Sequence, residues 1–106
     1  MDHFEQLKRI TAGLNKRFPD GNDPFQIMTR LLEECGELAR EVNHFAGSGV
    51  KCEKYGEPDR AHLAKEIRQV LTCALQVAAY YGVEAELQDA IESAYQQVKA
   101  EGLIED

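Results

Sequence analysis

Residues 31–41 read Leu-Leu-Glu-Glu-Cys-Gly-Glu-Leu-Ala-Arg-Glu, an apolar helical pattern that carries four carboxylates within nine residues. Burying one carboxylate without a partner is unfavourable, and clustering several adds like-charge repulsion. The stretch is therefore either a solvated helix face or a cation-binding site. The choice between these two interpretations depends on what the rest of the chain can bring next to Glu33, Glu34, Glu37 and Glu41.

The helix that contains this stretch is predicted to run from Pro24 to about Ala46. Asp23 at the N-cap, followed by Pro24 at the first helical position, is a strong start signal. Gly36 in the middle of the helix is unfavourable by about 1 kcal/mol relative to Ala, and a close helix crossing is a simpler reason for it than a ligand. The expected apolar stripe consists of Phe25, Met28, Leu31, Leu32, Cys35, Leu38, Ala39, Val42 and Phe45.

Three more amphipathic helices are predicted around this one. The first follows Asp2 and ends before the turn-forming residues 18–22, and the last runs from Val83 or Glu84 to Glu101. Between them, Asp59 can cap a long helix from about Arg60 to Tyr81, which Gly82 closes. No strand-like alternation is present. We expect one all-α domain over residues 1–106, a four-helix bundle with two long central antiparallel helices, completed by association of several copies.

Composition limits the function classes. The chain has 106 residues and a net charge of −7, so no basic excess exists to neutralise the phosphates of a nucleic acid polymer. The N-terminus has no apolar signal region and no run of 18 apolar residues occurs, which argues against secretion and against a membrane span. The cysteines form no Cys-x-x-Cys pair, so we expect a reducing, cytoplasmic location with Cys35 and Cys73 as small core residues.

Helical geometry places a second polar group opposite the first. Glu34 and Glu37 lie about 60° apart on their helix, and Glu66 and Gln69 repeat this arrangement on the next long helix. If the two helices pair antiparallel, four oxygen-bearing side chains face each other across a groove and suit Mg²⁺ or Mn²⁺. Glutamates are also common on solvated helix faces, so the residues alone leave both interpretations open.

At these residues the chain resembles a known family. Glu33-Glu34-Cys35-Gly36-Glu37 matches the Glu-Glu-x-x-Glu motif of MazG-like, all-α nucleoside triphosphate pyrophosphohydrolases. Twenty-eight residues separate Glu37 from Glu66, a spacing compatible with that family, and the resemblance covers most of the chain from Asp23 to Glu101. It implies a Mg²⁺-dependent hydrolase that splits a nucleoside triphosphate into a monophosphate and pyrophosphate, with a house-cleaning role in the nucleotide pool. It also implies a homodimer or homotetramer.

Carried over by position, the resemblance implies Glu34, Glu37, Glu66 and Gln69 as metal ligands. Glu33 and Glu34 are the candidate catalytic residues, and Glu33 could be a ligand, a supporting group or the base for water. One departure is clear: Gln69 stands where the family has Asp, so the site loses one of four negative charges. The alternative is therefore a weakened or non-enzymatic relative that binds a metal or a nucleotide or acts as an interaction module. Candidate substrate-binding residues are Lys51, Lys54, Arg68 and Lys99, with Arg60 and Lys65 as further cations.

Other constellations are less informative. Glu41 and His44 form one Glu-x-x-His pair, whereas a di-iron bundle needs two such pairs and two more Glu, so we expect His44 to be a helix-end residue near a carboxylate. His62 lies one turn before Glu66 and is expected to have a surface or capping role. Gly47-Ser48-Gly49 lacks the Lys-Ser/Thr of a phosphate-binding loop.

Overall fold

A computed structural model of the chain describes residues 1–47 and 56–105. It contains the helices α1 (His3–Arg17), α2 (Pro24–Phe45), α4 (Arg60–Tyr81) and α5 (Glu84–Ala100), and no strand among the described residues. The predicted all-α class and the helix boundaries are confirmed to within one residue at most ends. Lys51 and Lys54, two of the candidate substrate-binding residues, lie outside the described residues.

The helix starts follow from side-chain caps. The Asp2 carboxylate accepts the backbone N–H of Glu5 at 2.7 Å, and the Asp23 carboxylate accepts that of Gln26 at 2.9 Å. Asp59 accepts the backbone N–H of Ala61 at 2.9 Å. These bonds satisfy donors that the first turn of a helix leaves unpaired, so each predicted cap is confirmed. Gly82 ends α4 with φ = 64°, a left-handed conformation that glycine adopts without a steric penalty.

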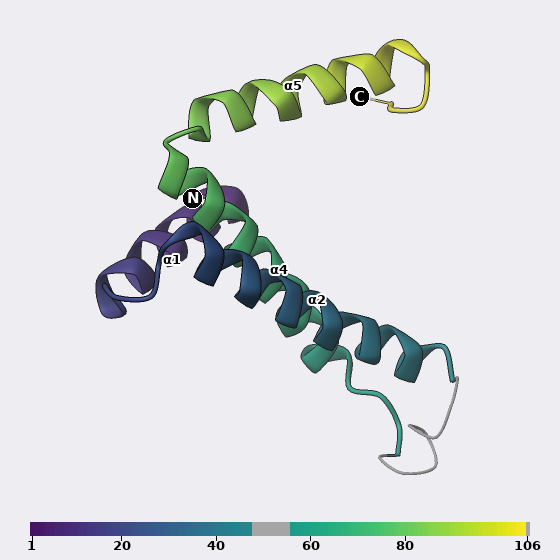
Figure 1. Ribbon diagram of the computed structural model, residues 1–106. Helices are drawn as coiled ribbons and strands as arrows, with labels where there is room; N and C mark the ends of the chain where they lie inside the picture. Colours follow the sequence, from purple (N-terminus) through teal and green to yellow (C-terminus); the bar gives the residue numbers. More distant parts are fainter. Residues whose placement is uncertain (48–55, 106) are drawn as a thin grey trace.

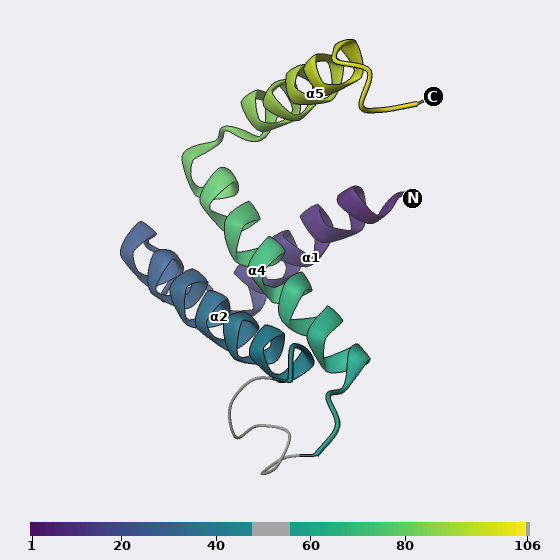
Figure 2. The ribbon, with the colours of Figure 1, turned by 90° about the vertical axis from the view of Figure 1, so that its right-hand side faces the viewer.

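The two long helices α2 and α4 pack side by side and antiparallel, as Figures 1 and 2 show. Helix α1 crosses α4, and α5 continues from the end of α4 and extends away from the other helices. No residue of α5 is buried. The described chain is therefore an antiparallel pair with one helix crossing it and one helix projecting from it. Among the described residues, no helix is long and apolar enough to cross a membrane.

The buried interior contains more polar than apolar side chains. Ile27, Cys73 and Ala78 are the buried apolar residues, which confirms the prediction for Cys73. The prediction that Cys35 is a core residue is wrong, because Cys35 is exposed. The close helix crossing expected at Gly36 is also missing within the described chain, since nothing lies within 4 Å of the position that a Cβ would take. The buried polar residues are Thr11, Glu41, His44, Glu66, Thr72 and Gln76.

Candidate metal centre

Three carboxylates meet between α2 and α4. Glu34 and Glu37 come from successive turns of α2, and Glu66 comes from α4, where it is only 5% exposed. Each offers one oxygen, and these oxygens all lie within 4.8 Å of one another. Oxygens on opposite sides of a Mg²⁺ ion are about 4.2 Å apart, since each Mg–O bond is about 2.1 Å long. The cluster is thus near the size of one octahedral cation site, and its all-oxygen donor set suits Mg²⁺ or Mn²⁺.

Gln69 is the fourth member of this group, in the position expected from the sequence. The end of its amide lies 3.0 Å from Glu34 Oε2 and 3.1 Å from Glu66 Oε2. With the amide nitrogen at that place, Gln69 donates a hydrogen bond to each carboxylate. With the amide oxygen there, three oxygens face each other and need a cation between them. The Gln69 amide can therefore act in two ways that differ by a 180° turn. In one orientation its nitrogen donates hydrogen bonds to the two carboxylates, and in the other its oxygen is a neutral ligand for a cation.

The electrostatics of the cluster are unfavourable without a cation. Burial raises the pKa of Glu34 above its usual value, and the nearby charges of Glu37 and Glu66 raise it further. Both effects disfavour the charged form of the carboxyl group. A bound divalent cation would instead favour the charged form of Glu34, because it supplies an opposite charge within contact distance of all three carboxylates.

Glu41 and His62 support Glu66 from the side, a connection that the sequence analysis did not predict. Nδ1 of His62 lies 3.1 Å from Glu41 Oε1, and its Nε2 lies 3.4 Å from Glu66 Oε1. Glu41 is 8% exposed, so His62 is a partner for a carboxylate that is almost fully buried. His62 is exposed, as expected for a surface residue, and it also bridges the two helices through its contacts with Glu41 and Glu66. The i,i+4 spacing of His62 and Glu66 was the only signal for it.

His44 confirms the expectation of a helix-end residue. It is buried one residue before the end of α2, and its Nε2 lies 2.6 Å from the backbone oxygen of Gly56. This contact joins the end of α2 to the segment that leads into α4.

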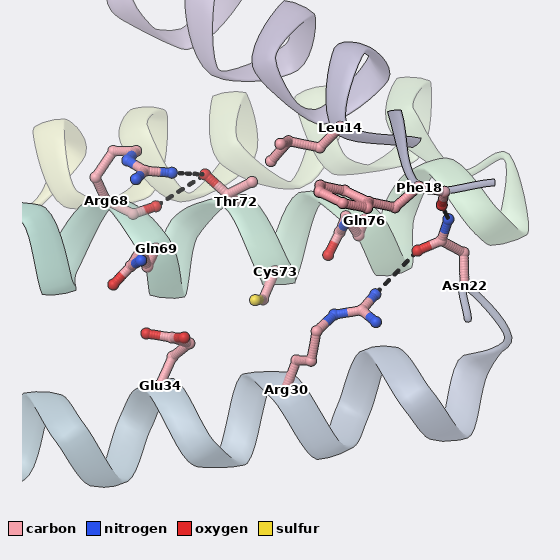
Figure 3. A pocket seen from close by; sticks show the side chains of 10 residues that line it. All are labelled: Leu14, Phe18, Asn22, Arg30, Glu34, Arg68, Gln69, Thr72, Cys73 and Gln76. Carbon is pink, nitrogen blue, oxygen red and sulfur yellow. Dashed lines mark hydrogen bonds between the residues drawn. The ribbon is translucent and has the colours of Figure 1, made fainter. Parts of the chain in front are cut away.

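Two cavities open on the same side of the α2–α4 pair. One of about 600 Å³ lies at the end near His44 and is lined mainly by ionisable groups: Glu37, Arg40, Glu41, His44, Glu57, Asp59, His62 and Glu66. The other, of about 280 Å³, lies between α1, α2 and α4 and is drawn in Figure 3. Its lining combines the acidic end of Glu34 with cationic, amide and apolar side chains: Leu14, Phe18, Asn22, Arg30, Arg68, Gln69, Thr72, Cys73 and Gln76.

Arg30 is the cation that the sequence analysis missed. It lies one turn before Glu34 on α2, and in Figure 3 its guanidinium group lies beside Asn22 at the edge of the cavity. Nη1 donates to the backbone oxygen of Gly21 at 2.7 Å, and Nη2 donates to Asn22 Oδ1 at 3.0 Å. Its position one turn from Glu34 could have been read from the helical spacing.

Of the remaining predicted site residues that the structure describes, only Arg68 lies beside the carboxylate cluster. Arg68 lines the cavity of Figure 3, and its Nη1 lies 3.5 Å from Thr72 Oγ1. Glu33 is exposed and lines neither cavity, because it lies about 100° around α2 from Glu34. Lys99 is on α5, in the part that extends away from the α2–α4 pair (Figure 1). Its role in substrate binding stays a prediction.

The chain is similar to a Bacillus subtilis (strain 168) protein with the name Uncharacterized protein YpjD. The two are 42% identical over 69 residues, which cover 61% of this chain and 60% of the relative. The match thus spans less than two thirds of the relative's length. No family model and no solved structure matches the chain.

Proposed function

We propose that this protein is a metal-dependent nucleoside triphosphate pyrophosphohydrolase, which converts a nucleoside triphosphate and water into a monophosphate and pyrophosphate. The observation that carries the proposal is the convergence of Glu34, Glu37 and Glu66 beside a cavity that also contains Arg30 and Arg68. Carboxylates alone would repel a triphosphate. Carboxylates that hold a divalent cation, next to two guanidinium groups, would attract one. The Glu-Glu-x-x-Glu resemblance names this same reaction.

Each group of residues around the cavity has a separate role in the proposed reaction. Glu34, Glu37 and Glu66 would hold Mg²⁺, which when bound offsets phosphate charge and favours ionisation of an attacking water. Arg30 and Arg68 would bind phosphate oxygens. Leu14 and Phe18 supply an apolar surface in the same cavity, against which a base or sugar could pack.

The bond that breaks joins the α-phosphorus to the bridging oxygen of the β-phosphate. Water supplies the new oxygen on the α-phosphate, and the pyrophosphate leaves with the bridging oxygen. Of the two candidate catalytic carboxylates, Glu34 lies inside the cluster whereas Glu33 faces away from it. We therefore assign acceptance of the water proton to Glu34. A role in clearing surplus or noncanonical nucleotides belongs to the same proposal.

Gln69 favours a second candidate, a relative that binds a metal or nucleotide but turns it over weakly. Its amide can donate to Glu34 and Glu66 and so partly satisfy both carboxylates without any cation. The same amide adds no negative charge when it turns its oxygen inward. Both effects lower cation affinity relative to a site with a fourth carboxylate.

Pyrophosphate release from a panel of canonical and modified triphosphates, with Mg²⁺ or Mn²⁺, tests the proposal. We expect metal-dependent release from at least one triphosphate, lost in Glu34→Gln and Glu37→Gln. Glu92→Gln, which changes a glutamate on α5, is the matched control and should keep wild-type activity. Absence of metal-dependent pyrophosphate from the entire panel would rule out the enzyme and leave the binding protein as the remaining candidate.

A further inference from the structure

The cavity of Figure 3 has two chemically different ends. One end lies at the carboxylate cluster, with Glu34 and Gln69, and the other lies where α1 meets α4, with Phe18 and Gln76. Gln76 follows Gln69 by seven residues, which is about 10 Å along α4 and within about 20° of the same face. That length is close to the reach of a nucleotide from its α-phosphate to the far edge of its base. A nucleotide with its α-phosphate at the cluster would therefore bring its base to Gln76.

Gln76 presents a hydrogen-bond acceptor at this far end. The residue is only 7% exposed, and its Nε2 donates a hydrogen bond to Asn15 Oδ1 at 3.2 Å. The nitrogen is thus directed toward α1, and in Figure 3 the side-chain oxygen of Gln76 points into the cavity. An amide oxygen accepts hydrogen bonds and cannot donate one. The base end of the cavity therefore favours a ligand that brings an N–H group to this oxygen.

Asn15 holds the Gln76 amide in this orientation from outside the cavity. It lies on α1 and is not among the residues that line the cavity. If the Gln76 amide alone turned by 180°, its oxygen would face Asn15 Oδ1, and two acceptors would meet with no hydrogen between them. The contact between α1 and α4 thus decides that the oxygen of Gln76, rather than its nitrogen, faces a ligand.

Phe18 gives the same end of the cavity a flat apolar surface. The guanidinium group of Arg17 lies 5.3 Å from the centre of the Phe18 ring, and this attraction between cation and ring restrains the ring. Every nucleobase can stack on an aromatic side chain, so stacking adds affinity with little preference for one base. Phe18 would therefore hold a base, and the hydrogen bond to Gln76 would distinguish between bases.

We propose that Gln76, oriented by Asn15, selects nucleotides whose base carries an exocyclic amino group, as cytosine and adenine do, over the deaminated counterparts uracil and hypoxanthine. The amino group donates an N–H to Gln76 Oε1. In the deaminated base a carbonyl oxygen takes the same place, so two acceptors face each other and neither is satisfied. The ring N–H of the deaminated base reaches Oε1 only if the base shifts relative to the α-phosphate. This inference rests on the proposed function, because it takes the α-phosphate to lie at the carboxylate cluster.

Pyrophosphate release from two matched pairs of triphosphates, CTP with UTP and ATP with ITP, tests the selection. The members of each pair differ in an amino or an oxo group at one ring position. We expect kcat/KM to be about tenfold higher for the amino member, since the oxo member leaves a buried acceptor unpaired. In Gln76→Met, which keeps the length of the side chain without the acceptor, the ratio should fall to about one.

Gln97→Met is the matched control, because Gln97 is an exposed glutamine on α5, and it should keep the wild-type ratio. Equal kcat/KM values within both pairs for the wild type would overturn the selection while the proposed reaction itself stands. The same holds for a preference for the oxo members.

Two variants of Asn15 test whether it positions Gln76. Asn15→Leu frees the Gln76 amide to present either end to the cavity, so the amino-to-oxo ratio should fall toward one. Asn15→Asp keeps an acceptor for Nε2 of Gln76 and should keep the preference. A merely structural role for Asn15 would lower kcat/KM for both members of a pair and leave their ratio unchanged, and this outcome would contradict the assigned role.

Equilibrium binding of CMP and UMP tests the selection without turnover. We expect the wild type to bind CMP about tenfold more tightly than UMP, and Gln76→Met to bind both with the same affinity. If the triphosphate panel gives no pyrophosphate but CMP is still preferred, the proposed reaction fails and the selection by Gln76 stands. Equal affinities for CMP and UMP in the wild type, or no binding of either, would overturn the selection.

Discussion

His62 contacts Glu66 through its Nε2, which lies 3.4 Å from Glu66 Oε1, and so leaves Glu66 Oε2 directed toward Glu34 and Gln69. The two oxygens of one buried carboxylate thus have different partners. Groups that contact a ligating carboxylate from behind fix its orientation and tune its affinity for the metal. Glu41, on the far side of His62, holds the imidazole from the neighbouring helix.

Removal of this support should weaken cation binding. We expect His62→Ala to lower Mn²⁺ affinity about tenfold, because Glu66 loses the group that orients it. Glu41→Gln should have a smaller effect, since an amide can still contact Nδ1 of His62. Mn²⁺ titration followed by electron paramagnetic resonance measures both, with His3→Ala as an exposed histidine control. Equal affinities for His62→Ala and His3→Ala would show that His62 does not position Glu66.

Glu34→Gln should stabilise the metal-free protein near pH 7. The variant removes two like-charge pairs of about 0.2–0.5 kcal/mol each, which corresponds to a rise in melting temperature of roughly 2–6 °C. The folded state raises the pKa of Glu34, so the wild type loses stability as pH rises through the interval between the unfolded and the folded pKa. Below the unfolded pKa, about 4.3, the carboxyl is neutral in both states and the advantage of the variant should vanish.

Thermal unfolding of wild type and Glu34→Gln at several pH values, with a chelator present, measures this difference. An advantage of the variant that grew as pH fell would contradict the assigned electrostatics. Addition of Mg²⁺ should reverse the order of stability, since only the wild type keeps all three carboxylates for the cation.

The all-α class, the four helices and the meeting of Glu34, Glu37, Glu66 and Gln69 could be predicted because they depend on local signals. Caps at Asp2, Asp23 and Asp59 fix the helix starts, and 100° per residue fixes which side chains share a face. These signals describe each helix by itself. Once α2 and α4 are assumed to pair antiparallel, they place the Glu34 and Glu37 side of α2 opposite the Glu66 and Gln69 side of α4.

Features that depend on the relation between helices could not be predicted in the same way. The apolar stripe predicted for α2 does not show which part of it meets α4, so the prediction places Cys35 in the core, whereas Cys35 is exposed. The contact between Glu41 and His62 joins residues on different helices, and its formation depends on their exact register. The projection of α5 away from the other helices left Lys99 without a place beside the cluster.

Gln69→Asp should strengthen cation binding. It replaces a neutral ligand by a charged one and removes the amide that can donate to Glu34 and Glu66, so we expect about tenfold tighter Mn²⁺ binding. The metal-free protein should melt at a lower temperature because a further like charge joins the cluster. Gln69→Asn, which has the same size as the Asp variant without the charge, separates charge from side-chain length. Tighter binding by both variants would assign the effect to length alone.

Arg30→Met should weaken triphosphate binding and loosen the turn before α2. The substitution removes the guanidinium group together with its hydrogen bonds to Gly21 O and Asn22 Oδ1, which should lower the free energy of unfolding by about 1 kcal/mol. Arg30→Lys keeps the charge without the two-pronged geometry, so it should retain more of the triphosphate affinity than Arg30→Met. Affinity for a non-hydrolysable triphosphate analogue in the presence of Mg²⁺ measures the difference. Identical affinities for the wild type and Arg30→Met would remove Arg30 from the binding site.

The central claim is that Glu34, Glu37 and Glu66 form a cation site, and calorimetric titration of the full chain with Mn²⁺ and with Mg²⁺ tests it most directly. We predict a saturable heat with one strong site per chain, which is lost in Glu37→Gln and kept in the control Glu92→Gln. A titration of the wild type that shows no saturable heat with either cation, or that matches the titration of Glu37→Gln, would contradict the account.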